Sequence, residues 1–465
     1  MELPIGFEAK YSKLLGDQAE AFLASFDQPI IKAFRINPLK AQQALYDTPF
    51  VDKVAWGQWG RVGAVSGHSV DHTTGLIYSQ EPSAQLVAEV AHPVPGDKVL
   101  DLAAAPGGKS THLASFLQGA GLLVSNEIFR KRATILSENM ERFGVANALV
   151  TNHAPADLSP RFAGFFDKIV LDAPCSGEGM FRKDPAAMQY WDVDYPAKCA
   201  DLQREILTEA VKMLKPGGEL TYSTCTFAPE EDEQMIAWLV NEYPWLTIMP
   251  INKPAGVDDG RPDWADGNPE LAKTARLFPH HLAGEGHFIA KLVSTLTEDD
   301  VATKPFKTPN TKVAKDALEL WEAFRSVNLP TFQPTQLLSF GDQLYAPPAG
   351  IPDLKGISVM RAGVHLGTLK KNRFEPSLAL ALALHPDQFA RVYALTDAEW
   401  AKYVHGDTFM VADRTQWSNG WYLLTMNGNG TGFGKLVDGQ MKNFYPKGLR
   451  FAVRETNIHL EDDLY

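Results

Sequence analysis

The sequence contains few cysteines and lacks long apolar runs. Its 465 residues include only three cysteines, Cys175, Cys199 and Cys225. Their odd number and wide spacing argue against a disulfide framework and form no CxxC zinc motif. No apolar stretch approaches the length of a membrane span, and the amino terminus, MELPIGFEAKYSKLL, lacks the features of a secretory signal. We therefore expect a cytoplasmic protein that binds neither membrane nor metal and whose cysteines act as thiols.

Positive charge is also scarce. Lys and Arg total 44 against 56 Asp and Glu, a formal net charge of -12, which weighs against nonspecific binding to nucleic acid. A nucleic-acid partner would have to be held by local basic patches. Hydrophobic residues make up 45% of the chain and charged residues 22%, as in soluble globular proteins.

The length and the residue patterns predict several domains. Between 76 and 295, short apolar strands alternate with amphipathic helices, which indicates an α/β domain with a parallel sheet. Gly144 is expected to end one helix, and Pro216 with Gly217 another. The strands are expected at DKVLDLA, GLLVSNE, ALVTN, FDKIVLDAP, GELTYSTCT and GHFIAKLV. The other predicted units are a small α/β module over 1–75, a polar linker over 296–312, an intermediate domain over 313–384 and an aromatic-rich domain over 385–465.

The segment VLDLAAAPGGKS predicts a cofactor loop. A strand ends at Asp101, a turn of small residues follows, and a helix begins near Lys109, so backbone amides can approach a nucleotide-like ligand. A phosphate-binding P-loop is disfavoured because Ala103 stands where its leading glycine would fall. The next strand ends at Glu127, whose carboxylate can accept hydrogen bonds from ribose hydroxyls. A plain turn followed by a helix-start glutamate is the structural alternative.

Two strand ends carry cysteines, in LDAPCSGEG and TYSTCTFAPEEDE. Both predicted strands deliver a thiol, Cys175 or Cys225, to the sheet edge where the cofactor loop lies, whereas Cys199 falls in a helix and is expected in the core. Methylation at carbon 5 of a cytosine needs a thiolate that adds at carbon 6 and later leaves, which suits cysteine. Asp172 could hydrogen-bond the base or merely cap its turn. From the residues alone the roles of the two cysteines are interchangeable.

These motifs, in this order and spacing, resemble the NOL/NOP/Sun family of RNA cytosine carbon-5 methyltransferases. FRINPLK and YSQEPSAQ add to a likeness that covers about 30–295. With its long extension the whole chain is similar to a bacterial branch that modifies decoding-region cytidines of 16S ribosomal RNA in the small ribosomal subunit. The resemblance implies a Rossmann-like class I methyltransferase core, a small N-terminal α/β module that binds RNA, and a C-terminal PUA-like region.

The resemblance also implies residue roles. Cys225 would be the nucleophile, and Cys175 would assist release of the methylated product. Where the family usually has an Asp near the adenine, this chain has Ala154, so either the nearby Asp157 or backbone would take over that contact. S-adenosylmethionine would be held by Ala103, Ala104, Ala105, Pro106, Gly107, Gly108, Lys109, Glu127, Arg132 and Asp172.

A target cytidine would have to be flipped out or single-stranded, and RNA contacts must surround it. Surface Lys and Arg are more often simply solvated, but some basic residues in or near the motifs and in the extension are candidates. They are Lys32, Arg35, Arg182, Lys183, Arg361, Lys370, Lys371 and Arg373.

The last unit interleaves aromatic and basic residues, which suits RNA stacking and equally suits a packed core. These residues are Trp421, Tyr422, Phe433, Phe444 and Tyr445 with Lys435, Lys442 and Lys447. The pair His280 and His281 is expected to be structural.

Two other functions stay open from the sequence. One is the same reaction on transfer RNA. The other is a noncatalytic ribosome assembly factor, which the intact Cys175 and Cys225 disfavour.

Overall fold

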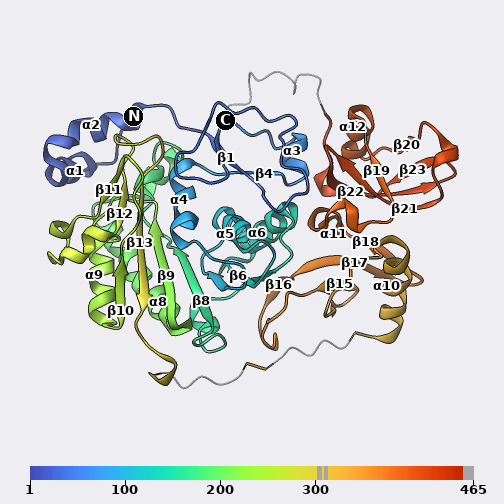
Figure 1. Ribbon diagram of the computed structural model, residues 1–465. Helices are drawn as coiled ribbons and strands as arrows, with labels where there is room; N and C mark the ends of the chain where they lie inside the picture. Colours follow the sequence, from blue (N-terminus) through green and yellow to red (C-terminus); the bar gives the residue numbers. More distant parts are fainter. Residues whose placement is uncertain (301–305, 308–312, 454–465) are drawn as a thin grey trace.

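The computed structural model describes residues 1–300, 306–307 and 313–453. Most of the predicted linker and residues 454–465 of the last predicted domain lie outside this range. A large central sheet runs through the molecule, with the N-terminal helices at one end and the C-terminal units at the other (Figure 1). Its strand order is β11-β12-β13-β9-β8-β5-β6-β7-β16, with β10 paired to β13.

The strands β7, β6, β5, β8 and β9 are parallel, and β13 is antiparallel to β9. This arrangement confirms the predicted Rossmann-like core. The strands of the sheet are β5 (Lys98–Asp101), β6 (Leu122–Asn126), β7 (Ala148–Thr151), β8 (Phe166–Asp172), β9 (Leu214–Thr224), β10 (Leu246–Met249), β11 (Val257–Asp259), β12 (Ala275–Leu277), β13 (His287–Ser294) and β16 (Val359–Ala362).

Helices bury both faces of this sheet. The helix α6 shows how: Ala133, Leu136, Met140 and Phe143 form its buried stripe, and Gly144 ends it in a left-handed conformation as predicted. The helix α8 ends at Met213, before the predicted stop at Pro216, because Leu214 already begins β9. One apolar core includes residues of α4 (Pro82–Ala91), α5 (Gly108–Leu117) and α6 (Arg130–Phe143). The other includes residues of α7 (Pro155–Leu158), α8 (Tyr195–Met213) and α9 (Glu233–Glu242).

The N-terminal module combines a helical pair with a small sheet of order β2-β3-β1-β4. Because β4 belongs to this sheet, the module extends past the predicted boundary at residue 75. Phe7 and Phe22 of the helical pair pack into a buried aromatic cluster with Phe181 and Phe227 of the core. The elements are α1 (Phe7–Leu15), α2 (Ala19–Ala24), β1 (Ala33–Ile36), β2 (Asp52–Lys53), β3 (Gly60–Val62), α3 (Val70–Thr73) and β4 (Ile77–Ser79).

The region after the linker is only partly separate from the core. Its strand β16 pairs with β7 and so extends the central sheet, which the sequence did not predict. The remaining strands form two sheets of order β14-β15-β17-β18 and β19-β21-β22-β23-β20. The elements of the first are α10 (Lys315–Asn328), β14 (Leu338–Phe340), β15 (Gln343–Ala346), β17 (Val364–Lys370), β18 (Arg373–Pro376) and α11 (Leu378–Ala383). Those of the second are β19 (Val392–Ala394), α12 (Asp397–His405), β20 (Phe409–Met410), β21 (Gly420–Met426), β22 (Asn429–Val437) and β23 (Gln440–Asn443).

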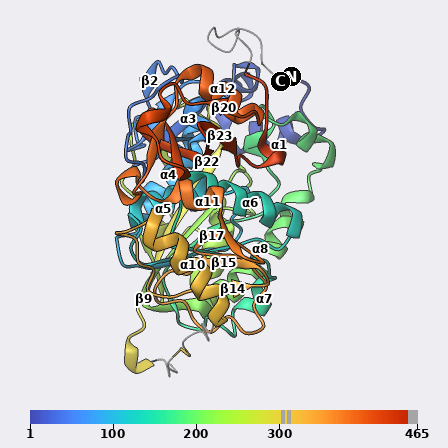
Figure 2. The same ribbon diagram turned by 90° about the vertical axis from the view of Figure 1, so that its right-hand side faces the viewer.

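The N-terminal module and the C-terminal region touch directly. The buried Lys40 ammonium donates to the Leu382 carbonyl oxygen at 2.7 Å, and Asn429 donates to the Gln42 carbonyl oxygen at 2.8 Å. Figure 2 shows α3 behind the C-terminal strands, with α11 close to α6. Segments at opposite ends of the sequence therefore hold one another in place.

Candidate active site

The predicted cofactor loop lies at the carboxyl edge of the sheet, between β5 and α5. Gly107 has φ 116°, a conformation that favours glycine, and the Ala105–Pro106 peptide bond is cis. Asp101 is fully buried: its Oδ2 accepts a hydrogen bond from Ser110 at 2.6 Å, and its Oδ1 has no partner among the described residues. Burial raises the pKa of this carboxyl to about 7. The loop therefore turns at Gly107 beside a buried acid.

Arg35 supports this loop from inside. Its guanidinium is fully buried and donates to the Gly108 carbonyl oxygen and the Thr111 hydroxyl, both at 2.8 Å, and to Gln80 at 2.6 Å. The prediction that Arg35 contacts RNA is therefore wrong, because all three bonds are internal. Arg35 of FRINPLK and Gln80 of YSQEPSAQ are thus hydrogen-bonded to one another, and Arg35 supports the cofactor loop at Gly108.

The next strand, β6, brings Glu127 to the same edge. The Glu127 carboxylate accepts the Phe129 amide at 2.9 Å and lies 3.3 Å from the Arg132 guanidinium. Arg132 also donates to the Ala105 carbonyl oxygen at 2.9 Å. Arg132 thus links the predicted ribose-binding acid to the cofactor loop.

Asp172 and Lys109 form an ion pair at the ends of β8 and the cofactor loop. The Lys109 Nζ lies 2.7 Å from the Asp172 Oδ2, and the Ser223 hydroxyl donates to Oδ1 at 2.8 Å. Burial alone would raise the pKa of Asp172, but Lys109, His287 and the Ser223 hydroxyl together lower it below its usual value. Burial alone would likewise lower the pKa of Lys109, yet Asp172 raises it. Both groups are therefore held charged.

The two predicted cysteines meet at this edge. The Cys175 Sγ lies 3.4 Å from the Cys225 Sγ, and both thiols are free. The contact with Cys225, followed by burial, raises the pKa of Cys175 well above its usual value. Cys199 is buried in α8, as expected. The pair can supply one thiolate beside one protonated thiol.

Two buried glutamates hold the loop that carries Cys175, and the sequence did not single them out. Glu231 accepts hydrogen bonds from the Ser176 amide at 3.0 Å and from Gln203 at 2.8 Å, and burial raises its pKa to about 8. Glu178 accepts from Trp191 at 2.9 Å and from Tyr11 of α1. Glu231 lies in the TCTFAPEEDE motif. The signal available in the sequence was this run of acidic residues directly after the strand end that carries Cys225.

The segment expected near the adenine follows β7. Ala154 precedes α7, and Asp157 lies in the first turn of that helix with an exposed side chain. His153 accepts the Ser358 amide at 2.6 Å, which ties this segment to the start of β16. The role of Asp157 stays a prediction.

Two more of the proposed RNA contacts are structural. Arg361 is fully buried and donates to the Val145 carbonyl oxygen at 2.8 Å and to that of Gly363 at 2.7 Å. Arg182 pairs with Glu285 at 3.1 Å and is 8% exposed. Both were predicted at a surface, and internal pairing explains the error. The candidates with exposed side chains are Lys32, Lys183, Lys370, Lys371 and Arg373.

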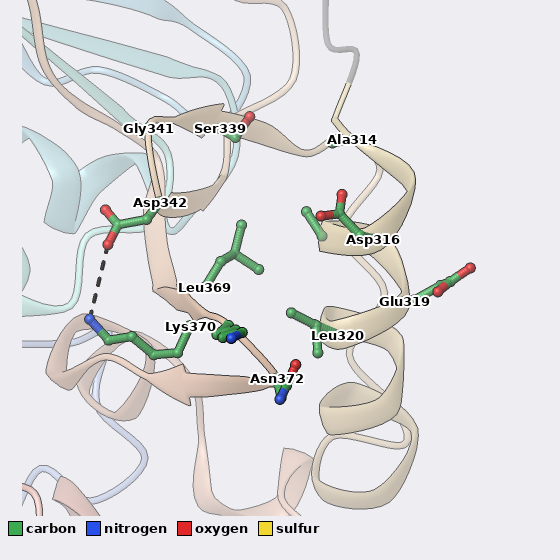
Figure 3. A pocket seen from close by; sticks show the side chains of 12 residues that line it. Ala314, Asp316, Glu319, Leu320, Ser339, Gly341, Asp342, Leu369, Lys370 and Asn372 are labelled. Atoms are coloured by element: carbon green, nitrogen blue, oxygen red, sulfur yellow. Dashed lines mark ion pairs between the residues drawn. The ribbon is translucent and has the colours of Figure 1, made fainter.

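Lys370 and Lys371 line a hollow of about 720 Å³ beside α10. Figure 3 shows Lys370 directed at Asp342, 4.0 Å away, with Asp316 and Glu319 on the facing helix. The acidic side chains offset the lysines here, so this hollow is not a basic patch.

The aromatic residues of the last unit divide into two groups. Tyr422, Phe433 and Tyr445 are buried in the core. Trp421 packs on the partly exposed Phe444, with ring centroids 4.4 Å apart, and Lys435 Nζ lies 5.6 Å from the Trp421 ring. Core packing therefore accounts for the first group, and only the second is accessible for stacking.

Within residues 1–300, 306–307 and 313–453, no helix is long and apolar enough to cross a membrane, and no group of three or more His, Cys, Asp or Glu is arranged to hold a metal ion. The His281 imidazole pairs with Asp258 at 2.8 Å, and the His280 ring lies tilted against that of His281, with ring centroids 3.9 Å apart.

The fold and the loop at its carboxyl edge define a Rossmann-like methyltransferase. Models of 16S rRNA methyltransferase RsmB/F and of three RsmF regions match the chain. The RsmB/F methyltransferase model matches residues 88–293. The three RsmF regions are the N-terminal domain at 3–82, the first C-terminal domain at 323–384 and the PUA domain at 390–451. Ribosomal RNA small subunit methyltransferase F of Pectobacterium carotovorum is 30% identical over 92% of this chain and 91% of its own, and that of Escherichia coli O81 is 30% identical over 92% of each. The chain therefore belongs to the RsmF family of 16S rRNA methyltransferases.

Solved structures support the same fold. A methyltransferase homologue from Pyrococcus horikoshii is 29% identical, with a TM-score of 0.55, over 62% of this chain and 93% of that one. NSun6 from Pyrococcus horikoshii, determined with SFG, has a TM-score of 0.55 at 19% identity over 63% of this chain and 99% of that one, a likeness of fold alone.

Proposed function

We propose that this protein transfers a methyl group from S-adenosylmethionine to carbon 5 of a cytidine in 16S ribosomal RNA, through a covalent adduct between Cys225 and the base. The observation that carries the proposal is the pair of free thiols, Cys175 and Cys225, 3.4 Å apart at the sheet edge. Beside them lies the Lys109–Asp172 ion pair. Methylation at an oxygen or an amine has no need of two thiols.

The residues at the edge fit S-adenosylmethionine. The Glu127 carboxylate suits ribose hydroxyls, and the glycine turn at Gly107 lets backbone amides come close. Ala103 to Lys109, Arg132 and Asp172 complete the proposed site, with Asp157 or backbone near the adenine. The cofactor, when bound, supplies the methyl group that carbon 5 receives.

The chain itself supplies the groups that activate the base. The Cys225 thiolate adds to carbon 6, so that carbon 5 becomes nucleophilic; once it is methylated, loss of its proton lets the thiolate leave. The charged Asp172 is positioned to hydrogen-bond the ring and favour this addition. The raised pKa of Cys175 keeps a proton beside Cys225, which suits a role in release.

The family supports a substrate in the small ribosomal subunit, and hence a cytoplasmic site of action. We propose RNA-binding roles for the N-terminal module, predicted over 1–75 and extended by β4 to Ser79, and for the last domain (385–465). The methyltransferase domain, predicted over 76–295, lies between them and is followed by the linker at 296–312 and the intermediate domain at 313–384. Lys32, Lys183, Lys371 and Arg373 remain candidate RNA contacts. Transfer RNA is the alternative substrate.

The test compares wild type, Cys225→Ala and Cys175→Ala with labelled S-adenosylmethionine and 30S particles. We expect Cys225→Ala to be inactive without an adduct, and Cys175→Ala to accumulate a denaturant-resistant protein–RNA adduct. Cys199→Ala, which changes the thiol outside the site, is the control. Methylation of cytosine by Cys225→Ala would refute the mechanism. In a parallel assay of wild type with tRNA, methylation of tRNA but not of 30S particles would refute the proposed substrate.

A further inference from the structure

His287 is a buried imidazole without a hydrogen bond. It begins β13 and is 3% exposed, and neither ring nitrogen has a hydrogen-bond partner among the described residues. Buried polar groups normally find partners, so an unpaired imidazole at a reactive edge calls for an explanation.

The strand register brings His287 to the same end of the sheet as Cys225. In the antiparallel pair β9–β13, Phe288 lies opposite Thr224 and Ile289 opposite Ser223. His287 and Cys225 are the next residues of the two segments beyond this register. Side chains alternate along strands, so His287 lies on the face of Ser223, whose hydroxyl bonds Asp172. Lys109 is a charged neighbour of both the His287 imidazole and Cys225, so the two side chains border the same ion pair.

Glu81 lies behind the imidazole. The Glu81 Oε1 is 3.6 Å from the His287 Nδ1, and the Glu81 carboxylate is fixed by the Ser83 amide at 2.8 Å and the Glu285 amide at 3.3 Å. A carboxylate on that side favours the tautomer with the proton on Nδ1, which leaves Nε2 as an acceptor.

We infer that His287 is the general base that deprotonates Cys225, with Glu81 as its positioning residue. The thiol proton moves from Sγ to Nε2, giving a thiolate and an imidazolium that Glu81 stabilises. When the thiolate leaves the methylated base, the same proton returns and restores the thiol. Activated cysteines in general have a base beside the nucleophile and a third group that orients the base. Here Cys225, His287 and Glu81 would take these places in that order. This inference rests on the proposed role of Cys225.

The charges around His287 are consistent with a base that is neutral before reaction. Burial lowers the pKa of the imidazole; Lys109 lowers it further, while Glu81 and Asp172 oppose the change. Glu285, two residues earlier, is already paired with Arg182. His287 is therefore unprotonated near neutral pH and able to accept a proton.

The test measures thiolate formation directly, without RNA or methyl donor. Alkylation of Cys225 by iodoacetamide is followed against pH by peptide mass spectrometry in wild type and His287→Gln. We expect His287→Gln to react roughly tenfold more slowly at pH 7, with its profile displaced to higher pH, and kcat to fall on the order of 100-fold with little change in KM. Glu81→Gln should shift the profile in the same direction by less, and it carries the test if His287→Gln does not fold.

His112→Gln is the matched control, since His112 is also buried and lies 3.3 Å from a glutamate, Glu89, but packs against Phe116 away from the thiols. Its alkylation profile should equal that of wild type. A wild-type profile in both His287→Gln and Glu81→Gln would overturn the inference while leaving the adduct mechanism intact. Failure of the Cys225→Ala test would instead refute the proposed function.

Discussion

At the scale of single residues, the site is built from buried ionisable groups, some held in the charged form and others favoured in the neutral form. Lys109 and Asp172 form an ion pair, whereas burial outweighs the surrounding hydrogen bonds and charges at Asp101 and Glu231 and raises their pKa values to about 7 and about 8. Charge therefore concentrates at the Lys109–Asp172 pair, where the base would react, and the two supporting carboxyls hold their protons more readily than an ordinary carboxyl.

Glu231 gives a pH dependence with a definite sign. Its pKa in the folded protein is about 8 against a usual 4.5, so between these values the folded state holds a proton that the unfolded state has lost. Stability should therefore fall as pH rises through this window, by up to about 1.4 kcal/mol per pH unit from this group. Urea unfolding of wild type and Glu231→Gln at pH 5 and pH 8 checks this. The variant should show a smaller loss, and an equal loss in both proteins would contradict the assignment.

At the scale of elements, the sequence predicted what local pattern determines. The strands of the core and the helix ending at Gly144 follow from apolar periodicity and a glycine stop, and the meeting of Cys175 with Cys225 follows from parallel strands sharing an edge. The contact of Arg35 with Gly108 spans 73 positions. No local signal distinguishes such an arginine from one on the surface.

The pairing of β16 with β7 was not predicted, because no local signal marks a contact between strands so far apart in the sequence. This pairing places Arg361 in the core, where it binds carbonyl oxygens. Arg361→Met should leave the carbonyl oxygens of Val145 and Gly363 unpaired in the core and cost about 1–3 kcal/mol of stability. Arg373, which is exposed and paired with Glu375, serves as the comparison. Arg373→Met should change stability by less than about 0.5 kcal/mol. Thermal unfolding of the two variants decides, and equal midpoints would contradict a structural role for Arg361.

At the scale of the whole molecule, an excess of negative charge meets a polyanionic substrate. With a formal net charge of -12, the protein gains little from nonspecific attraction to phosphates, so recognition should depend on a preformed ribonucleoprotein surface. We expect faster methyl transfer to 30S particles than to protein-free 16S RNA at the same concentration and salt. Naked RNA as the better substrate would contradict this.

The pairing of β16 with β7 also affects solubility. An edge strand exposes a row of unpaired amides and carbonyls to which other chains can add. The strand β7 is buried along its whole length, and it would become such an edge in a fragment that ends before β16. The C-terminal region therefore covers this edge of the catalytic sheet, and we expect a free methyltransferase fragment to present an apolar edge to its own copies.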